Sequence, residues 1–328
     1  MVKYILKRIG ISILILLGVS LILYTLLRCM PTDFVEAKIL ALNTSGTTVS
    51  DEFIKEMYRT YGLDGNIIEG YFGWLGNACR LNFGDSFISQ RSVISEIFNP
   101  DRIGTSFIVA AIATIFEFLI AIPLGITAAT HQYSLRDYVV TVLVMIGISL
   151  PSFFFGQMLK DLFANKLGWL PVSGMTDATK DYTGFGAVID YLRHMTLPIL
   201  TVVILSIGGR MRTTRTNMLE VLNADYIRTA RAKGLKEGSV IYKHAFRNTM
   251  IPVVTSLAGL IPSLFSGAMI TESVFDLTGI GSYALNAMTQ GDIPVIMTYN
   301  MFLAALSVLG VLLADLMYAV VDPRVKLA

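Results

Sequence analysis

The residues whose types and spacing indicate a function lie in one basic stretch, which contains a glycine that is predicted to end a helix. Positions 225–235 read Asp-Tyr-Ile-Arg-Thr-Ala-Arg-Ala-Lys-Gly-Leu. Asn223 is predicted to cap a helix here, with Asp225 in the first turn, where the helix dipole stabilises a carboxylate. Gly234 is predicted to end this helix in the left-handed conformation, and a second helix is predicted to start at Gly238–Ser239. The pattern therefore predicts two short helices joined by a glycine turn.

The two faces of the first helix differ in chemistry. Tyr226 and Ile227 are each in register with Ala230 on a helix. Arg231 and Lys233 project elsewhere, toward acidic groups on a partner or toward solvent. A basic loop can serve only to fix membrane topology or to contact anionic lipid. The small apolar face favours a docking helix, because small residues let a groove in another protein approach the backbone closely.

Catalytic and metal-binding patterns are missing from the sequence. Its three histidines are far apart, and two cysteines cannot form a four-thiolate metal site or a disulfide framework. The sequence also contains no Gly-x-x-x-x-Gly-Lys-[Ser/Thr] phosphate-binding loop. We therefore expect a protein that is not an enzyme and that binds no cofactor or metal itself.

One ionisable residue lies in the middle of an apolar stretch. Glu117 would cost about 2.5–3.5 kcal/mol at the centre of a bilayer, so it is predicted to line an interior pathway or to hydrogen-bond a neighbouring helix. Pro151 and Phe153 are further pathway candidates. Pro151, Pro252 and Pro262 permit kinks, although proline is common in membrane helices and packing explains the prolines equally well.

The composition indicates that these residues are held by membrane-spanning helices. The chain of 328 residues is 54% hydrophobic and 15% charged, with a net charge of +2. Soluble domains carry about 25% charged residues, and disordered chains lack this much apolar surface. A spanning helix needs about 20 apolar residues. On this measure the sequence predicts six spans, at residues 9–27, 103–129, 139–159, 195–209, 250–270 and 294–321.

The ends of the spans and the distribution of basic residues predict the topology. The first span is longer than the apolar part of a signal peptide and is expected to be retained. Lysine and arginine are concentrated in the short N-terminal segment and in residues 210–249, which places both termini and this loop in the cytoplasm. The fourth span is expected to continue into water as a basic helix over 210–222. Asp315 is expected to anchor the inner end of the last span, with a cation such as Arg324.

These boundaries predict four regions. A first membrane helix (1–28) precedes an extracytoplasmic domain (29–102), which contains a helix-like stretch at 51–61 and turns at 62–64 and 82–86. A five-helix core (103–321) carries the cytoplasmic loop, and a cytoplasmic tail (322–328) follows.

Several motifs in sequence order resemble the first (B-type) permease subunit of oligopeptide, dipeptide and nickel ABC importers. The longest is Asp-Tyr-Ile-Arg-Thr-Ala-Arg-Ala-Lys-Gly in the basic loop. The broader importer motif starts Glu-Ala-Ala, whereas this chain has Arg-Thr-Ala at 228–230. Other departures are Met30–Asp33, where the family usually has Pro-Gly-Asp-Pro, and Thr278, where proline is common. The matching pieces are 225–234, 244–252, 148–153, 167–174, 197–201, 272–275, 279–281, 291–295 and 322–324.

The resemblance implies an all-α integral membrane protein with the six-helix fold of a type I ABC importer permease. It implies a bacterial or archaeal cytoplasmic membrane, a second homologous permease, two cytoplasmic ATPases that bind ATP and Mg, and an extracytoplasmic solute-binding protein. Besides these partners we expect membrane lipid and no nucleic acid. The implied cargo is a peptide, with a nickel complex or another small solute as the alternative. The ATPase-coupling residues implied are Asp225, Tyr226, Ala230, Arg231, Lys233, Gly234 and Leu235.

A secondary ion-coupled carrier is the rival from another class. Such a carrier needs paired ionisable groups within the membrane and broken helices. The sequence offers only Glu117 as a central ionisable group, and no matched pair of broken helices is evident from it. We therefore favour the importer permease.

Overall fold

The computed structural model describes residues 2–29, 35–36, 39–40, 44, 50–177, 179–180, 182–249 and 259–321. Helices dominate these ranges, and the only β pairing within them is an isolated bridge between Asp85 and Ser92. The predicted tail, Met30–Asp33, Pro252 and Arg324 lie outside the described residues.

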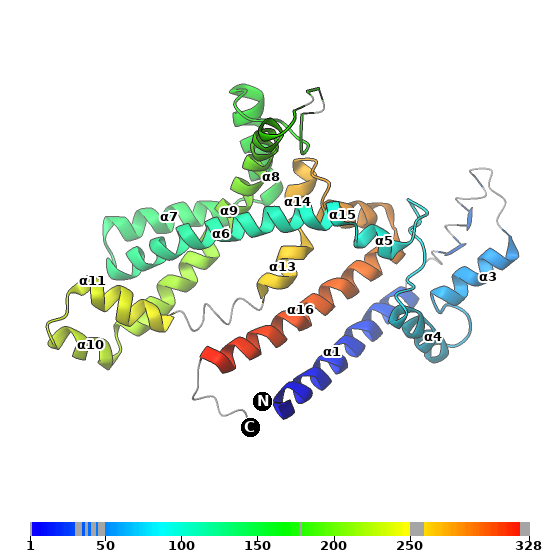
Figure 1. Ribbon diagram of the computed structural model, residues 1–328, viewed down its shortest axis with the longest axis horizontal. Helices are drawn as coiled ribbons and strands as arrows, with labels where there is room; N and C mark the ends of the chain where they lie inside the picture. Colours follow the sequence, from blue (N-terminus) through cyan, green and yellow to red (C-terminus); the bar gives the residue numbers. More distant parts are fainter. Residues whose placement is uncertain are drawn as a thin grey trace.

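Four helices are long and apolar enough to cross a membrane, and they match the first, second, fourth and sixth predicted spans. In Figure 1, α1 and α16 run side by side, and α6 crosses close to α9. The large side chains exposed along α1, α6 and α16 are mostly apolar, as expected of surfaces that face lipid. The helices are α1 (Val2–Arg28), α6 (Pro100–Thr130), α9 (Phe185–Leu222) and α16 (Ile293–Val321).

The fourth predicted span belongs to a much longer helix. α9 begins at Phe185 instead of residue 195, and it continues without a break through the predicted basic helix to Leu222. Pro198 lies inside α9, and the helix continues on both sides of it. The helix thus starts before the predicted span, and the polar residues Asp190 and His194 are buried within it.

The third predicted span is divided by a break. α7 (Leu135–Ser149) is followed by α8 (Ser152–Leu159), which runs on into a π-helix over Lys160–Lys166. Between α7 and α8, Leu150 is extended (ψ 131°), as expected of a residue that precedes a proline. The predicted span 139–159 is therefore divided into two helices at Pro151, one of the prolines expected to permit a kink.

A second break lies in the described part of the fifth predicted span. α13 (Leu260–Ser266) ends at Gly267, and α14 (Met269–Val274) follows. Gly267 has a φ of +69°, which favours glycine, and a Cβ there would come within 2.8 Å of the Gly281 nitrogen. α15 (Ile280–Gln290) completes this part of the chain.

The described residues between α1 and α6 form three short helices that pack onto the long ones. α3 (Asp51–Thr60) matches the predicted helix, and α4 (Ile67–Cys79) and α5 (Val93–Ile97) follow. Gly62 and Gly84 have positive φ, as the predicted turns require. Trp74 of α4 shares a buried cluster with Tyr24 of α1 and Met297 of α16.

Polar contacts reinforce this packing. The Tyr24 hydroxyl donates to the Gly62 carbonyl at 2.6 Å. Asp292, which is buried just before α16, accepts hydrogen bonds from the Ser86 hydroxyl (2.6 Å) and the Phe87 amide (3.1 Å). The segment before α6 is thus joined to both the first and the last long helix.

Candidate coupling loop and its ion pairs

The loop that follows α9 contains a short helix with a glycine stop. α10 (Asp225–Ala232) ends at Lys233, and Gly234 has a φ of +74°. The Gly234 amide donates to the Arg231 carbonyl at 2.9 Å, and the Leu235 amide donates to the Ala230 carbonyl at 3.4 Å. These are the two bonds of a Schellman motif, so the predicted glycine stop is confirmed.

The start of α10 differs from the prediction. Asn223 caps the C-terminus of α9, where its side-chain amide donates to the Leu219 carbonyl at 2.9 Å. The N-cap of α10 is Ala224, which has no side-chain oxygen. The predicted Asn223 cap is wrong because α9 extends to Leu222 and uses this asparagine for its own end. The second helix begins at Glu237 (α11, Glu237–Ser239), one residue before its predicted start.

The inner face of α10 packs on the protein itself. Ile227 and Ala230 are buried with Ile126 of α6 and Met218 of α9, in a cluster that also includes Val240. Tyr226, expected on the same face as Ala230, is 47% exposed, and Leu235 is 41% exposed. Ala230 therefore lies in an intramolecular contact, whereas Tyr226, Gly234 and Leu235 are exposed.

The charged residues of the loop are partly paired within it. Arg231 forms an ion pair with Glu237 across the glycine turn at 2.7 Å. The hydrogen bond from Arg231 lowers the pKa of Glu237 below its ordinary value. Asp225 lies 3.6 Å from Arg228 in an exposed pair, and Lys233 is exposed. Arg231 was expected to face solvent or an acidic group on a partner, and in this structure its contact is internal.

Glu117 is bound to a neighbouring helix. Its carboxylate accepts a hydrogen bond from Nε of Arg210 on α9 at 3.0 Å, and the Arg210 guanidinium lies 4.4 Å from the centre of the Phe118 ring. Of the two expectations for Glu117, a hydrogen bond to another helix is the one the structure contains. Pro151 is the N-cap residue of α8, and Phe153 is exposed. Among the described residues, no hydrogen bond or ion pair joins either of them to Glu117.

Two further ion pairs were not found by reasoning from the sequence. Arg215 of α9 binds Asp137 of α7 with two bonds, Nε to Oδ1 at 3.1 Å and Nη2 to Oδ2 at 2.9 Å. Arg8 of α1 lies 2.9 Å from Asp315 of α16. Asp315 thus has a cationic partner, as expected. The partner in the structure is Arg8, and no local sequence pattern reveals that Arg8 lies next to Asp315.

A buried carboxylate was also missed. Glu272 of α14 accepts hydrogen bonds from the Ser106 hydroxyl (2.7 Å), the Ser282 amide (2.9 Å) and the Ala268 amide (3.2 Å). It joins α6, α14 and the N-terminus of α15, where the helix dipole stabilises negative charge. The available signal was a glutamate within an apolar run, next to the Gly-Ile-Gly motif that starts α15.

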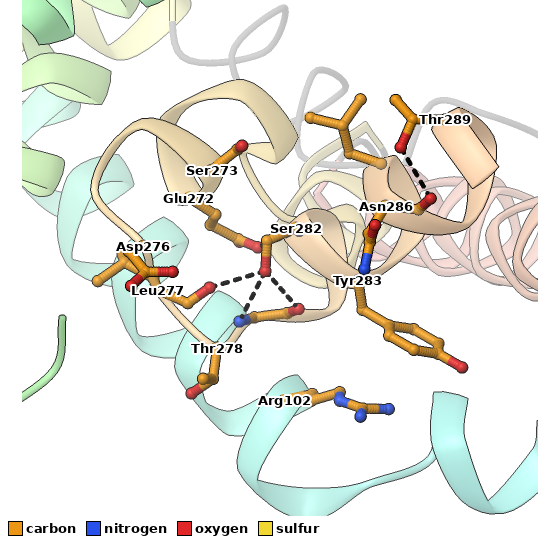
Figure 2. Close-up of a pocket in the computed structure, with 12 residues that line it drawn as sticks. Arg102, Glu272, Ser273, Asp276, Leu277, Thr278, Ser282, Tyr283, Asn286 and Thr289 are labelled. Carbon is orange, nitrogen blue, oxygen red and sulfur yellow. Dashed lines mark hydrogen bonds between the residues drawn. The ribbon is translucent and has the colours of Figure 1, made fainter. Parts of the chain in front are cut away.

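Glu272 lies beside a cavity of about 440 Å³. The Ser282 hydroxyl donates to the Leu277 carbonyl at 2.7 Å and accepts from the Gly279 amide at 3.2 Å. Figure 2 shows Ser282 beside Leu277, with Arg102 on the other side of the space. The Arg102 guanidinium lies 4.0 Å from the centre of the Tyr283 ring. The cavity is lined by Arg102, Glu272, Ser273, Asp276, Leu277, Thr278, Gly279, Ser282, Tyr283, Leu285, Asn286 and Thr289.

Within the described parts of the chain, no three histidine, cysteine, aspartate or glutamate side chains are grouped so that they could hold a metal ion. Cys29 and Cys79 are both exposed free cysteines.

Comparison with known proteins assigns this architecture to a family. Residues 121–327 match the model described as binding-protein-dependent transport system inner membrane component, and residues 1–110 match the model of its N-terminal region. The oligopeptide transport system permease protein AppB of Bacillus subtilis is 35% identical over 99% of this chain and all of its own length. The di/tripeptide permease DppB of Pseudomonas aeruginosa and the dipeptide permease DppB of Escherichia coli are each 33% identical over 99% of both chains.

The two family models and the full-length relatives describe membrane proteins, which is consistent with the long apolar helices of this chain. The chain belongs to the family of binding-protein-dependent transport system inner membrane components, the multi-pass permeases of ABC importers in the cytoplasmic membrane.

Proposed function

We propose that this permease imports peptides, and that it forms the translocation pathway together with a second homologous permease. The relatives named above are oligopeptide, di/tripeptide and dipeptide permeases, and each matches this chain over nearly its full length. A solute-binding protein would deliver the peptide, and two ATPases that bind ATP and Mg would supply the energy. The chain itself would hold no cofactor.

The proposed topology has six spans with both termini in the cytoplasm. α1, α6, α9 and α16 supply four spans. The divided pair α7–α8 and the stretch that ends with α13 and α14 would supply the other two. Residues 29–102 would then lie outside the cytoplasm, and α10 would lie inside it.

The Schellman turn at Gly234 is the main support for docking of α10 on an ATPase. It reverses the chain after α10 and leaves Leu235 exposed, while Ile227 and Ala230 hold α10 onto α6 and α9. Apart from its two chain neighbours, no residue has an atom within 4 Å of the position where a Cβ of Gly234 would be built. A groove of an ATPase could therefore approach the backbone closely at this turn.

Cysteine cross-linking in membranes that contain all subunits tests this docking site. Cys29 and Cys79 are first replaced by serine, and single cysteines are then introduced at Tyr226 or Leu235. A short bifunctional thiol reagent should join either position to an ATPase subunit, whereas a cysteine at the exposed Thr289, beside the cavity, should not be joined. Equal cross-linking from all three positions, or none from Tyr226 and Leu235, would contradict the docking site.

An uptake assay identifies the transported substrate directly. Cells or proteoliposomes with the complete system should accumulate a labelled di- or oligopeptide in an ATP-dependent and binding-protein-dependent manner. Competition by unlabelled peptides but not by a nickel chelate complex is expected. Accumulation of nickel without peptide competition would replace the peptide assignment with the alternative cargo.

A further inference from the structure

α9 connects the loop directly to the bundle. It runs without a break from Phe185 to Leu222, and only Asn223 and Ala224 separate it from α10. Ile227 of α10 also packs on Met218 of α9 in the buried cluster. Because the connection is short and packed, a displacement of α10 must displace the adjoining end of α9.

Two ion pairs join this end of α9 to two different helices. Arg210 pairs with Glu117 of α6, and Arg215 pairs with Asp137 of α7. Residues five positions apart project about 140° apart around a helix, so the two arginines reach in different directions. Both carboxylate side chains are largely buried, at 11% exposure for Glu117 and 7% for Asp137.

Ion pairs fix the relative position of these helices in a way that apolar contacts do not. Around Glu117, within the predicted second span, lipid tails are as apolar as leucine, so apolar contact alone discriminates weakly between neighbouring registers of two helices. Sliding or rotating α9 against α6 or α7 would leave a buried carboxylate without its cation, which is strongly unfavourable. Gly125 of α6 adds a close contact between the two pairs, facing Thr214 and the Met211 carbonyl.

The joined region ends at the break between α7 and α8. Beyond Pro151, Gly156 of α8 faces Thr201 of α9 and Phe275, which follows α14. α8 therefore packs on the far half of α9 and on the part of the chain after the Gly267 break. Both halves of the divided third span pack on α9, but α7 also contacts α6 whereas α8 also contacts α14, and the two halves meet at the non-helical Leu150–Pro151 junction.

We propose that Glu117–Arg210 and Asp137–Arg215 are positioning pairs that make α6, α7 and α9 move as one body with α10, with the bend at Leu150–Pro151 absorbing the motion. This inference rests on the proposed docking of α10 on an ATPase. It assigns the four charged residues to energy coupling, and it removes Glu117 from the surface that contacts cargo.

The test measures how much peptide is imported for each ATP hydrolysed by the reconstituted complex of all subunits. Arg215→Gln and Asp137→Asn should each lower this ratio about fivefold, as expected when a coupling element is loosened, while ATP hydrolysis continues. The charge exchange Asp137→Arg with Arg215→Asp should restore much of the ratio. Glu117→Gln should lower the ratio without changing the peptide concentration that gives half-maximal import. Arg212→Gln, which removes an exposed arginine from the same helix, is the matched control and should keep the wild-type ratio.

The outcomes separate the inference from the proposed function. One outcome is that import and ATP hydrolysis fall in equal proportion in Arg215→Gln, without recovery in the charge-exchange variant. That result would show that the pairs only hold the fold, and it would overturn the inference. A change in half-maximal peptide concentration in Glu117→Gln would return Glu117 to the pathway and would also overturn it. A wild-type complex that binds no ATPase and imports no peptide would instead overturn the proposed function.

Discussion

Gly125 of α6 and Thr214 of α9 are in such close contact that a Cβ at position 125 would lie 2.7 Å from the Thr214 Cβ. The same Cβ would lie 2.9 Å from the Met211 carbonyl oxygen, which is backbone and cannot rotate away. The small residue at this point lets the two long helices approach closely, as small residues do in membrane bundles.

Gly125→Ala is therefore expected to lower the melting temperature of the purified permease in detergent. Elsewhere in a helix the same change removes backbone entropy from the unfolded chain and gains about 0.5–1 kcal/mol. The overlap with Thr214 should outweigh that gain and cost about 1–3 kcal/mol, as overpacking usually does.

Gly104→Ala is the matched control for this prediction. Gly104 is in the same helix, and nothing lies within 4 Å of a Cβ built there. This variant should be as stable as the wild type or slightly more stable. Equal melting temperatures for both variants would show that the contact of α6 with α9 is looser than described.

The glycine turn after α10 offers a prediction that depends on backbone conformation alone. Gly234 has a positive φ but open space around it, so Gly234→Ala should cost about 1–2 kcal/mol through left-handed strain, not through a clash. Limited proteolysis should cut the loop faster, and import by the complete system should fall. Gly238→Ala, where the space is also open and φ is not positive, should leave both unchanged.

The carboxylate of Glu272 should stabilise the junction of α6, α14 and α15. Ser106→Ala removes one donor to this buried group and is expected to cost about 1–3 kcal/mol. Glu272→Gln replaces an acceptor oxygen with an amide that faces backbone N–H groups, and it should cost at least as much. Thermal unfolding of both variants and of the double variant measures the effect.

The double variant of Ser106 and Glu272 should be less destabilised than the sum of the single variants, because the two residues share one hydrogen bond. Ser273→Ala, at an exposed neighbour of Glu272, should leave the melting temperature unchanged. Additive losses, or a loss in the control, would contradict the assigned network.

The Arg231–Glu237 pair predicts a pH dependence for the loop. Since the hydrogen bond from Arg231 lowers the pKa of Glu237, the pair stabilises the turn above the ordinary glutamate pKa. This contribution is lost as the pH falls through the lowered value. Carbon-13 NMR of the labelled carboxyl group should report a pKa below about 4.3, the ordinary value, in the wild type.

Arg231→Gln should return the pKa of Glu237 to its ordinary value, whereas Arg228→Gln, at a neighbouring exposed arginine, should leave it low. Protease cleavage at the turn should become faster at acidic pH in the wild type and should be less sensitive to pH in Arg231→Gln. An ordinary pKa in the wild type would show that the pair does not persist in solution.

Local features of the chain could be predicted from the sequence. Four long helices, the stop at Gly234 and the turns at Gly62 and Gly84 follow from apolar length and from glycine conformations, which neighbouring residues determine. The break inside the third span was harder to predict. Pro151 was recognised as a possible kink, but the sequence did not predict that Leu150 would be extended and would separate α7 from α8.

Contacts between distant residues could not be predicted. Glu117 and Arg210 are 93 positions apart, and Asp292 and Ser86 are 206 apart, so their meeting depends on the packing of whole helices. Ala230 was expected at the closest approach to a partner because small residues let a groove come near the backbone. In the structure it is instead buried with Ile227 on α6 and α9.

Broken helices and paired ionisable groups, which we expected of an ion-coupled carrier, are both present in this permease. It contains helices broken at Pro151 and Gly267 and ion pairs within the bundle. Broken helices and ionisable groups are therefore insufficient to distinguish the two classes, and the family match is what separates them.

The contact of Asp292 with Ser86 and Phe87 has a consequence for building hybrid transporters. A chimera that exchanges only the region before α6, and brings a residue without a hydroxyl to position 86, would remove a side-chain donor from this buried aspartate. The exchangeable unit must therefore include the junction of α15 and α16 along with the N-terminal region, although about two hundred residues of sequence lie between them.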